Sequence, residues 1–590
     1  MNSEGFVYSP LPDDSIRLVQ FEIGPSEHIS LKLGVCTLKS APHFTALSYT
    51  WGGEARSKLI NLQGTVFRIT PNLEAFLLEA KRRIETLSTK NELDEKRWNG
   101  GWLWIDAICI DQSNTLEKNV QVAMMKNIYE RAQTIISWLG KLDDDAKLGM
   151  EYVLDFDYFR ERKPLNQSSK FSSDIMPGEE WKLLREKAIH ATHKLISRSY
   201  WTRVWIIQEA TTPKEPCHSL VWCGSYTDDF ETFTKSADWI TRISMIDGLP
   251  GKLHNVSTDA LRGLISIRKM RQNHIASDII DLYFLLPYVH TFDATDSRDK
   301  IFGLSSLFPE KGLTSTVPDY NANARDVYFR VACNLIRSDR RLDILGFCAT
   351  VGDFCLPSWV PDWTSTYMPK PFLRRSLDAS LRLTTLYNAT NNTEFNGSID
   401  EDNGILYASG FEFDGVSWLA IPRFDNSGRD QDIALSWQIA ALAPWSKYIT
   451  GCTRQEALAH TVCADAACFS DDPQVHSLLG KRLASVPVPD HDHDLGIFAW
   501  PDPLVRDSTV QRVLFFTDKG YMGLGPYTTN IGDKVCLLKG AQFPVILRGE
   551  KDDWALVGES YVHGIMDGEG WQEMLSEKNT ECEIRTFAVK

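Results

Sequence analysis

The first third of the chain alternates short runs of apolar, β-favouring residues with longer stretches whose apolar residues recur every three or four positions. Residues 44–51 alternate and run into Gly52 and Gly53, which predicts a strand followed by a tight turn. Residues 102–106 and 134–139 predict two more strands. We expect these strands to belong to one sheet, because helical patterns separate them.

Those helical patterns cover 71–87 and 117–131. Thr70 before Pro71 is a favourable helix start, and one face of the first segment is apolar. Asn114 followed by Glu117 resembles a capping box at the start of the second segment. The order strand, helix, strand, helix, strand predicts a parallel sheet with both helices packed on it and ligand sites at the carboxyl ends of its strands.

Other segments predict antiparallel pairing. Residues 59–62 and 65–69 form the arms of a predicted hairpin that turns at Gln63 and Gly64. Residues 511–560 contain short apolar runs separated by turn residues, which predicts a small antiparallel barrel or sheet.

The predicted fold is an α/β amino-terminal domain, an α-rich middle region and a small carboxy-terminal antiparallel β domain. The predicted parts are an extension at 1–43, the α/β domain at 44–230, the helical region at 231–390, a mixed α/β region at 391–500 and the β-rich domain at 501–590.

Composition narrows the class of protein. A length of 590 residues predicts several domains. Lys and Arg number 63 against 78 Asp and Glu, and the resulting net charge of -15 disfavours nucleic acid as the main partner. We expect no membrane span, because no apolar run reaches the length of one. The 12 scattered cysteines and the absence of a signal-peptide pattern predict buried thiols in a reducing cytoplasm.

Several segments together resemble the fungal heterokaryon incompatibility (HET) domain family. They are ALSYTWG at 46–52, WLWIDAICIDQ at 102–112, WLG at 138–140 and WTRVWIIQE at 201–209. The resemblance continues at 297–304, 318–320, 356–363, 517–526 and 561–569, and so covers nearly the whole chain. Asp111 departs from it, because the family more often has Asn there.

The resemblance implies a role in non-self recognition between fungal strains that ends in growth arrest or cell death. The HET domain is in turn similar to TIR domains, which have a flavodoxin-like fold and whose enzymatic members cleave NAD through one glutamate in a Trp-x-x-x-Glu segment. Trp205 and Glu209 have that spacing, and residues 47–51 and 104–106 are similar to the first two TIR strands. The resemblance thus implies a possible NAD glycohydrolase with NAD as substrate and no bound cofactor.

Glu209 is the candidate catalytic residue. Cleavage of the nicotinamide–ribose bond develops positive charge on the ribose, which one carboxylate can stabilise. The alternative is a structural Glu209 that caps a helix or forms a salt bridge with Arg203.

The candidate substrate-binding residues are Tyr49, Trp51, Gly52, Gly53, Asp106 and Trp205. The glycines would let a nucleotide approach backbone N–H groups, the Trp51 indole could stack on a base, and Asp106 could accept bonds from ribose hydroxyls. The alternatives are a core tryptophan beside a tight turn and an aspartate that caps the following loop.

The spacing of histidine and cysteine predicts no metal site. Two groups combine these residues: Cys217, His218 and Cys223, and His460, Cys463 and Cys468. Neither has the paired CxxC spacing of zinc sites. Cys109 is expected to be a buried apolar residue rather than a nucleophile, and the acidic and histidine-rich run at 490–494 a solvated loop.

Three functional hypotheses follow. The chain is an incompatibility effector that acts through NAD cleavage, or a non-catalytic module that self-associates or recruits protein partners in cell-death signalling. The third is a non-self sensor whose specificity lies after residue 230.

Overall fold

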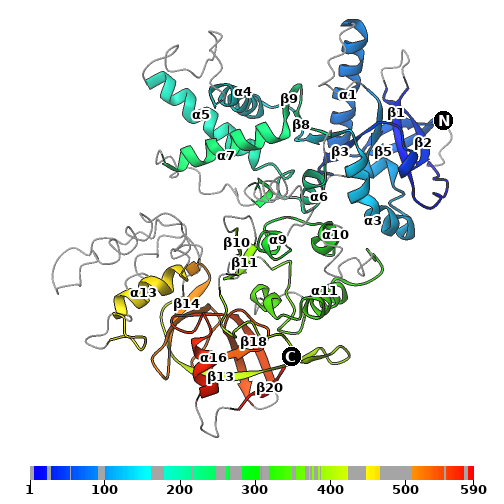
Figure 1. Ribbon diagram of the computed structural model, residues 1–590. Coiled ribbons are helices and arrows are strands. Elements are labelled where there is room, and N and C mark those ends of the chain that lie inside the picture. Colours follow the sequence, from blue (N-terminus) through cyan, green and yellow to red (C-terminus); the bar gives the residue numbers. More distant parts are fainter. Residues whose placement is uncertain are drawn as a thin grey trace. The chain divides into compact units, whose positions relative to one another are not determined.

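The computed structural model divides the chain into two compact units, which are considered one at a time (Figure 1). One unit comprises Met1–Ile280, Thr291–Leu307 and Val317–Asn321, and the other Asp281–His290, Phe308–Thr316 and Ala322–Lys590. The structure describes residues 6–22, 28–53, 55–90, 100–160, 179–213, 217–246, 261, 263–265, 282–305, 307, 318–348, 354–365, 371–372, 375–377, 383–385, 387–422, 447–465, 508–550, 553–576 and 583–590. Among these residues, no helix is long and apolar enough to cross a bilayer.

The amino-terminal unit is built on a mixed sheet in the order β5-β4-β2-β1-β6-β3-β7-β8-β9. Its strands are β1 (Ser15–Phe21), β2 (Ser30–Thr37), β3 (Phe44–Tyr49), β4 (Lys58–Leu62), β5 (Thr65–Ile69), β6 (Trp102–Trp104), β7 (Thr134–Trp138), β8 (His218–Cys223) and β9 (Tyr226–Asp229). Its helices are α1 (Pro71–Lys90), α2 (Asp106–Cys109), α3 (Thr115–Arg131), α4 (Asp144–Arg160), α5 (Glu179–Ile196), α6 (Trp205–Thr211), α7 (Phe230–Ile246) and α10 (Asp299–Ser305).

The predicted parallel strands are confirmed. β3 pairs in parallel with β6 and β7, and β7 pairs in parallel with β8. The Phe76 ring of α1 packs against the rings of Trp138 and Trp222, 5.8 and 5.9 Å away, and the Tyr129 hydroxyl of α3 donates to the Leu47 carbonyl at 3.2 Å. The sheet is nevertheless larger than predicted, because antiparallel strands extend both sides of this parallel core.

The predicted hairpin is also confirmed. β4 and β5 pair antiparallel around Gln63 and Gly64, whose φ angles of 50° and 81° are those of a type I′ turn. The hairpin joins the sheet because β4 pairs in parallel with β2.

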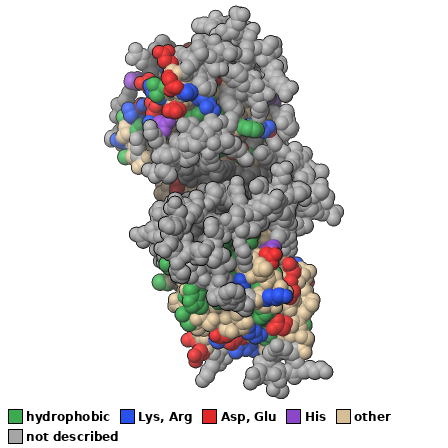
Figure 2. All heavy atoms as spheres, turned by 90° about the vertical axis from the view of Figure 1, so that its left-hand side faces the viewer, with side chains coloured by type: hydrophobic (Ala, Val, Ile, Leu, Met, Phe, Trp, Pro, Cys, Tyr) green, Lys and Arg blue, Asp and Glu red, His purple; other side chains and the backbone are tan. Residues whose placement is uncertain are grey.

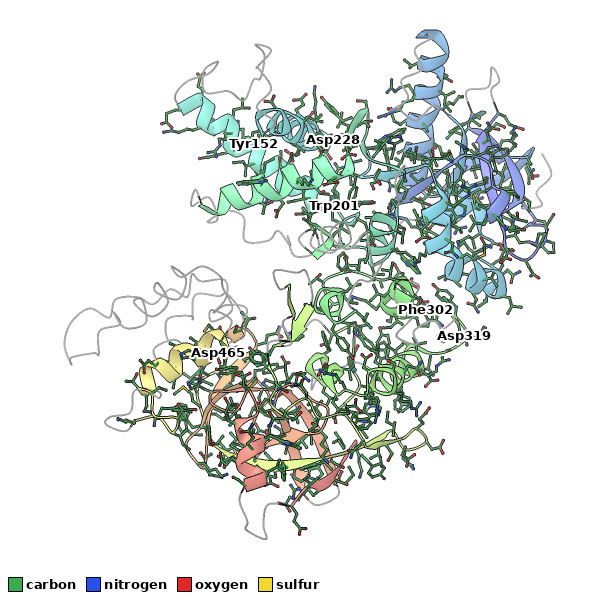
Figure 3. The ribbon with its side chains drawn as sticks, in the orientation of Figure 1. Tyr152, Trp201, Asp228, Phe302, Asp319 and Asp465 are labelled. Atoms are coloured by element: carbon green, nitrogen blue, oxygen red, sulfur yellow. The ribbon has the colours of Figure 1, made fainter. Side chains whose placement is uncertain are left out.

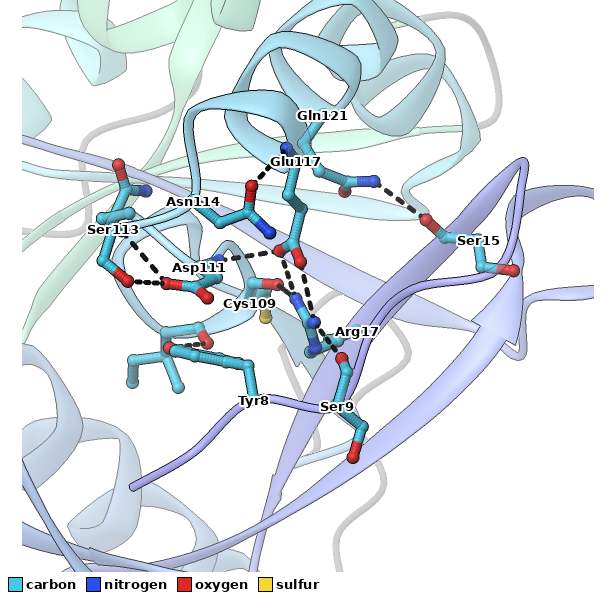
Figure 4. A network of polar contacts seen from close by, with 12 residues as sticks. Tyr8, Ser9, Ser15, Arg17, Cys109, Asp111, Ser113, Asn114, Glu117 and Gln121 are labelled. Atoms are coloured by element: carbon cyan, nitrogen blue, oxygen red, sulfur yellow. Dashed lines mark hydrogen bonds and ion pairs between the residues drawn. The ribbon is translucent and has the colours of Figure 1, made fainter. Parts of the chain in front are cut away.

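The predicted extension at 1–43 contributes two strands to the same sheet, since β1 pairs with β2 and, at Val19, with β6. The Arg17 side chain, 1 % exposed, fixes β1 to α3 by an ion pair with Glu117, and also donates to the Cys109 carbonyl at 3.0 Å (Figure 4). This ion pair corrects the predicted capping box. Asn114 accepts from the Glu117 N–H at 3.2 Å as expected, but the Glu117 carboxylate accepts from Arg17 and from the Asp111 N–H.

Large aromatic side chains fill the rest of this unit. Trp201 stacks on Phe233 of α7 at 5.6 Å with an interplanar angle of 2°, and it is 1 % exposed (Figure 3). Its indole N–H donates to the Leu195 carbonyl at 3.2 Å, so the end of α5 and the start of the 200–209 segment are held together.

The carboxy-terminal unit is a strand-rich sheet with a few helices. Its strands are β10 (Arg375–Leu377), β11 (Leu383–Thr385), β12 (Ser398–Asp400), β13 (Ile405–Leu419), β14 (Arg512–Thr517), β15 (Met522–Pro526), β16 (Lys534–Leu538), β17 (Val545–Glu550), β18 (Asp553–Glu559), β19 (Tyr561–Val562) and β20 (Arg585–Val589). Its helices are α9 (Leu282–Val289), α11 (Ala324–Asp339), α13 (Arg454–Cys463) and α16 (Glu569–Ser576).

The strands predicted within 511–560 are confirmed as β14 and β16–β18. The main sheet runs β16-β17-β18-β20-β13-β14-β15-β19, and an additional pairing of β16 with β13 closes five of these strands into a ring. The long strand β13 changes register near Glu412 and again near Val416, which lets it leave the ring and pair with β14. The core includes Phe411, Phe515 and Trp571. The helical character of 231–390 stays a prediction, because 308–317 and most of 247–281 lie outside the described residues.

We expect Arg17→Met to lower the free energy of unfolding by about 3–5 kcal/mol, because it leaves the Glu117 carboxylate buried beside an apolar side chain. Denaturant unfolding followed by tryptophan fluorescence measures the loss. Arg82→Met is the matched control, since Arg82 is 55 % exposed in its pair with Glu79 and should contribute less than about 1 kcal/mol. Equal losses in the two variants would contradict the role given to Arg17.

Candidate functional site

A cavity of about 470 Å³ lies in the amino-terminal unit beside the carboxyl ends of β3 and β6. Its described lining consists of Thr50, Trp51, Gly52, Gly53, Asp106, Ile110, Gln112, Lys118, Val122, Met125, Ser199, Arg203, Trp205, Asp293, Ala294, Thr295, Asp299 and Tyr320. The sheet edge is the one at which parallel α/β sheets bind ligands. All these residues belong to the same compact unit.

Trp51, Gly52 and Gly53 form one wall of the cavity, where the chain turns after β3. Gly52 and Gly53 have φ angles of 81° and 63°, which favour glycine because a side chain strains the backbone there. The Trp51 indole N–H donates to Asp106 Oδ2 at 3.0 Å. The structure therefore brings these four predicted residues together, although no ligand contact tests their predicted role.

Asp106 begins α2 and is only partly exposed, facing the cavity. Its Oδ1 accepts from the Ala107 N–H at 2.7 Å, a contact with the next residue of the same helix. Burial raises the pKa of Asp106 to about 6, with Arg203 opposing the rise and the charge of Glu209 adding to it. A carboxyl group with a perturbed pKa in a cavity is a candidate for binding or proton transfer.

Glu209 lies in α6, is 3 % exposed and is absent from the described lining of the cavity. Its Oε2 accepts a hydrogen bond from the Ser48 hydroxyl and lies 3.4 Å from a guanidinium nitrogen of Arg203. The Ser48 hydroxyl is also 2.9 Å from the Tyr200 hydroxyl. The salt bridge considered as the structural alternative is thus present, while catalysis by Glu209 stays a prediction.

Arg203 connects the two carboxylates. It lines the cavity and forms the ion pair with Glu209. Its positive charge also opposes the rise in the pKa of Asp106 that burial causes. The Val204 N–H donates to the Asp293 carbonyl at 2.9 Å, so the segment that carries Arg203 is also fixed to the segment that carries Asp293. A ligand that enters the cavity therefore meets Arg203 and Asp106 before Glu209.

The remaining two predicted residues differ in their positions. Trp205 lines the cavity, and its indole N–H donates to Asp299 Oδ2 at 3.1 Å. Tyr49 is buried in β3, and burial, followed by the charge of Asp106, raises its pKa well above the usual value. Tyr49 is therefore a core residue of β3 and is absent from the described lining of the cavity.

The lining residues that follow residue 230 were not among the predicted site residues. The Tyr320 hydroxyl donates to Asp299 Oδ1 at 2.6 Å, and the Lys118 ammonium lies 3.6 Å from the centre of the Tyr320 ring. Burial raises the pKa of Asp299, against the hydrogen bonds from Tyr320 and Trp205. A signal was present, because Asp299 and Tyr320 both belong to segments that carry the family resemblance.

The cavity combines aromatic faces, two cationic side chains and three aspartates. Such a lining can stack a planar ring, pair with phosphate and accept hydrogen bonds from hydroxyl groups. These are the groups that a nucleotide presents.

The structure describes some, but not all, of the other residues that the sequence raised as chemical candidates. Cys109 is fully buried, and burial raises the pKa of its thiol to about 12, as expected of an apolar rather than a nucleophilic residue. The 490–494 run and Cys468 lie outside the described residues.

Comparison with known proteins supports the sequence resemblance. Residues 44–209 match the family described as heterokaryon incompatibility protein (HET), and residues 496–578 match the Het-6 beta-barrel domain. The chain is 24 % identical to "Heterokaryon incompatibility protein 6, OR allele" of Neurospora crassa over 95 % of each chain. No solved structure matches the chain.

The raised pKa of Asp106 predicts a pH-dependent stability. Because about 6 lies above the unfolded value of about 3.9, the native state binds more protons between these pH values, and this group destabilises the fold progressively as pH rises across them. Asp106→Asn cannot ionise. We therefore expect its unfolding midpoint to rise relative to wild type from about pH 4 to about pH 6 and the difference then to level off.

The control for that experiment is Asp144→Asn, which removes one negative charge from the exposed first turn of α4. A difference between Asp106→Asn and wild type that does not change with pH would contradict the assigned titration.

Proposed function

We propose that this protein, a HET-domain protein with a carboxy-terminal Het-6 barrel, takes part in heterokaryon incompatibility. The observation that carries the proposal is the similarity to the Neurospora crassa incompatibility protein, which extends over 95 % of both chains and thus includes both matched domains. In this role the protein would act in the cytoplasm, where the contents of fused cells mix. Its action would lead to growth arrest or cell death.

Within this role, the HET-domain cavity binds a ligand of the nucleotide class, for which NAD is the first candidate. Asp106 supplies a carboxylate for ribose hydroxyls, Arg203 and Lys118 supply charge for the diphosphate, and Trp51 offers an aromatic face. At neutral pH Asp106 is mostly ionised, because pH 7 lies above its pKa of about 6.

The same arrangement suits cleavage of the nicotinamide–ribose bond. Nicotinamide leaves with the electron pair of the C–N bond, water oxygen bonds to the ribose carbon, and the products are nicotinamide, ADP-ribose and a proton. Of Asp106 and Glu209, Asp106 is better placed to stabilise the positive charge that develops on the ribose, since it borders the cavity directly. Glu209 would act behind it, by holding Arg203.

One observation favours the non-catalytic alternative. The Glu209 carboxylate is satisfied inside the fold by Ser48 and Arg203, which is the arrangement of a structural residue. In that case the HET domain would signal through self-association or through protein partners. Acidic and basic side chains are intermixed on the described part of the face in Figure 2, and with the net charge of -15 this favours protein partners over nucleic acid.

Incubation of the purified protein with NAD, followed by chromatography of nicotinamide, tests the proposed reaction. We expect Asp106→Asn to lower the rate of release by about 100-fold or more, because it removes the charge that stabilises the transition state. Its unfolding midpoint at neutral pH should not fall by more than that of Asp144→Asn, a control that should keep the wild-type rate.

Glu209→Gln separates positioning of Arg203 from support of the fold, because loss of positioning lowers the rate measured per folded molecule. If Glu209 only supports the fold, its loss leaves Arg203 without its partner and the rate falls together with the unfolding midpoint. Folded wild-type protein that releases no nicotinamide contradicts the reaction. If expression of that protein still arrests growth, the non-catalytic module is the correct account of the role.

A further inference from the structure

A compact group of side chains of the types that ligate metals lies in the carboxy-terminal unit, on elements that the proposed function does not use. His460 is on the last turn of α13, Asp465 follows that helix, and His563 follows β19. Each can offer a ligand atom, and the three ligand atoms lie within 4.8 Å of one another. Figure 3 shows Asp465 at the end of α13 that points towards the strands.

The backbone at the end of α13 directs Asp465 towards His460. Thr453 and Glu456 form a complete capping box at the start of this helix, and Ala464 ends it with a φ of 48°. Asp465 also has a positive φ, 53°, so the chain folds back over the last turn. Asp465 Oδ1 then lies 2.5 Å from His460 Nδ1.

Residues from the sheet complete the group. The Tyr561 hydroxyl donates to Asp465 Oδ2 and lies 3.2 Å from His563 Nδ1. The His563 ring stacks on the His460 ring, with centroids 5.0 Å apart and an interplanar angle of 15°. His563 Nε2 is 3.8 Å from Cys452 Sγ, on the turn that precedes α13.

We propose that His460, Asp465 and His563 form a binding site for a divalent transition-metal ion, with Cys452, which lies beside His563, as the fourth ligand, and that zinc is the best match. Two imidazoles, a carboxylate and a thiolate are a donor set that zinc accepts and that magnesium and calcium do not. Tyr561 orients the site from outside, because it contacts both Asp465 and His563.

The distances fit a site that closes on an ion by small movements. Zinc–ligand bonds of about 2.0–2.3 Å place neighbouring ligand atoms of a tetrahedron about 3.2–3.8 Å apart. The distance of 3.8 Å between Cys452 Sγ and His563 Nε2 is close to this value, and the ligand atoms of His460, Asp465 and His563 lie within 4.8 Å of one another. His460, Asp465 and His563 are all half-buried, so an ion can reach them while its ligands stay ordered by the fold.

Bound zinc would join α13 and its preceding turn to the end of β19, which lie about 100 residues apart in the sequence. Since binding to the folded state alone stabilises that state, the ion would raise the unfolding temperature of this unit in a concentration-dependent way.

The experiment uses the full chain, treated with chelator and then titrated with zinc sulfate in a calorimeter and in thermal unfolding. We expect one high-affinity ion per chain and a higher unfolding midpoint. His460→Ala and His563→Ala should each weaken zinc binding by about 100-fold or more, and Tyr561→Phe, outside the ligand set, by about 10–100-fold. His218→Ala, an exposed histidine on β8, is the control and should bind zinc as wild type does.

Cobalt provides a second readout that does not depend on stability. Co²⁺ bound to wild type should show near-ultraviolet sulfur-to-metal absorption, and Cys452→Ser should lose this absorption while circular dichroism shows a folded protein. The proposal is overturned if wild type binds no zinc, or if folded His460→Ala and Cys452→Ser keep wild-type zinc affinity and cobalt absorption, because the ion would then bind to other groups.

Discussion

The ion pair between Arg203 and Glu209 is the interaction on which the organisation of the cavity in the amino-terminal unit depends. It places a guanidinium between a buried carboxylate and one that borders the cavity, and its segment is hydrogen-bonded to the segment that carries Asp293. Removal of either partner would leave a poorly solvated charge, which folded proteins tolerate badly. The ion pair between Arg203 and Glu209 thus contributes both to the position of the cavity wall and to the charge inside the cavity.

That ion pair also decides which acid meets a ligand. Glu209 is held by Ser48 and Arg203 within the fold, whereas Asp106 retains contact with the cavity and has a pKa of about 6. Similarity of motifs pointed to Glu209 because of its spacing from Trp205, and the spacing is compatible with both roles. For the reaction proposed above, Asp106 is therefore better placed than the glutamate of the motif.

Local patterns predicted local structure well. The strands at 44–51, 102–106 and 134–139 and the turn at Gln63-Gly64 were correct, because alternation, helical periodicity and turn chemistry are properties of neighbouring residues. Partners far apart in the sequence were missed. Glu117 was expected to complete a helix cap, but the buried Arg17, 100 residues away, binds its carboxylate instead.

The cavity and the histidine group show the same contrast between local patterns, which were predicted, and distant partners, which were not. The Trp51–Gly53 turn and Asp106 were expected to meet because parallel strands end at one sheet edge, and they do. Asp299 and Tyr320 complete the cavity from the segment after residue 230, where no spacing rule links them to β3. His460 and His563 are similarly far apart, so a search for paired cysteines could not find the group that they form with Asp465.

A crystal structure of the protein with ADP-ribose would test directly whether the cavity binds a nucleotide, because ADP-ribose retains the ribose and diphosphate of NAD but cannot be cleaved at the nicotinamide bond. We expect ADP-ribose in the 470 Å³ cavity, with a ribose hydroxyl donating to Asp106, the diphosphate near Arg203 or Lys118, and Glu209 still bound by Ser48. Clear density for the ligand elsewhere, or a ribose bound directly by Glu209 with its ion pair to Arg203 broken, would contradict it.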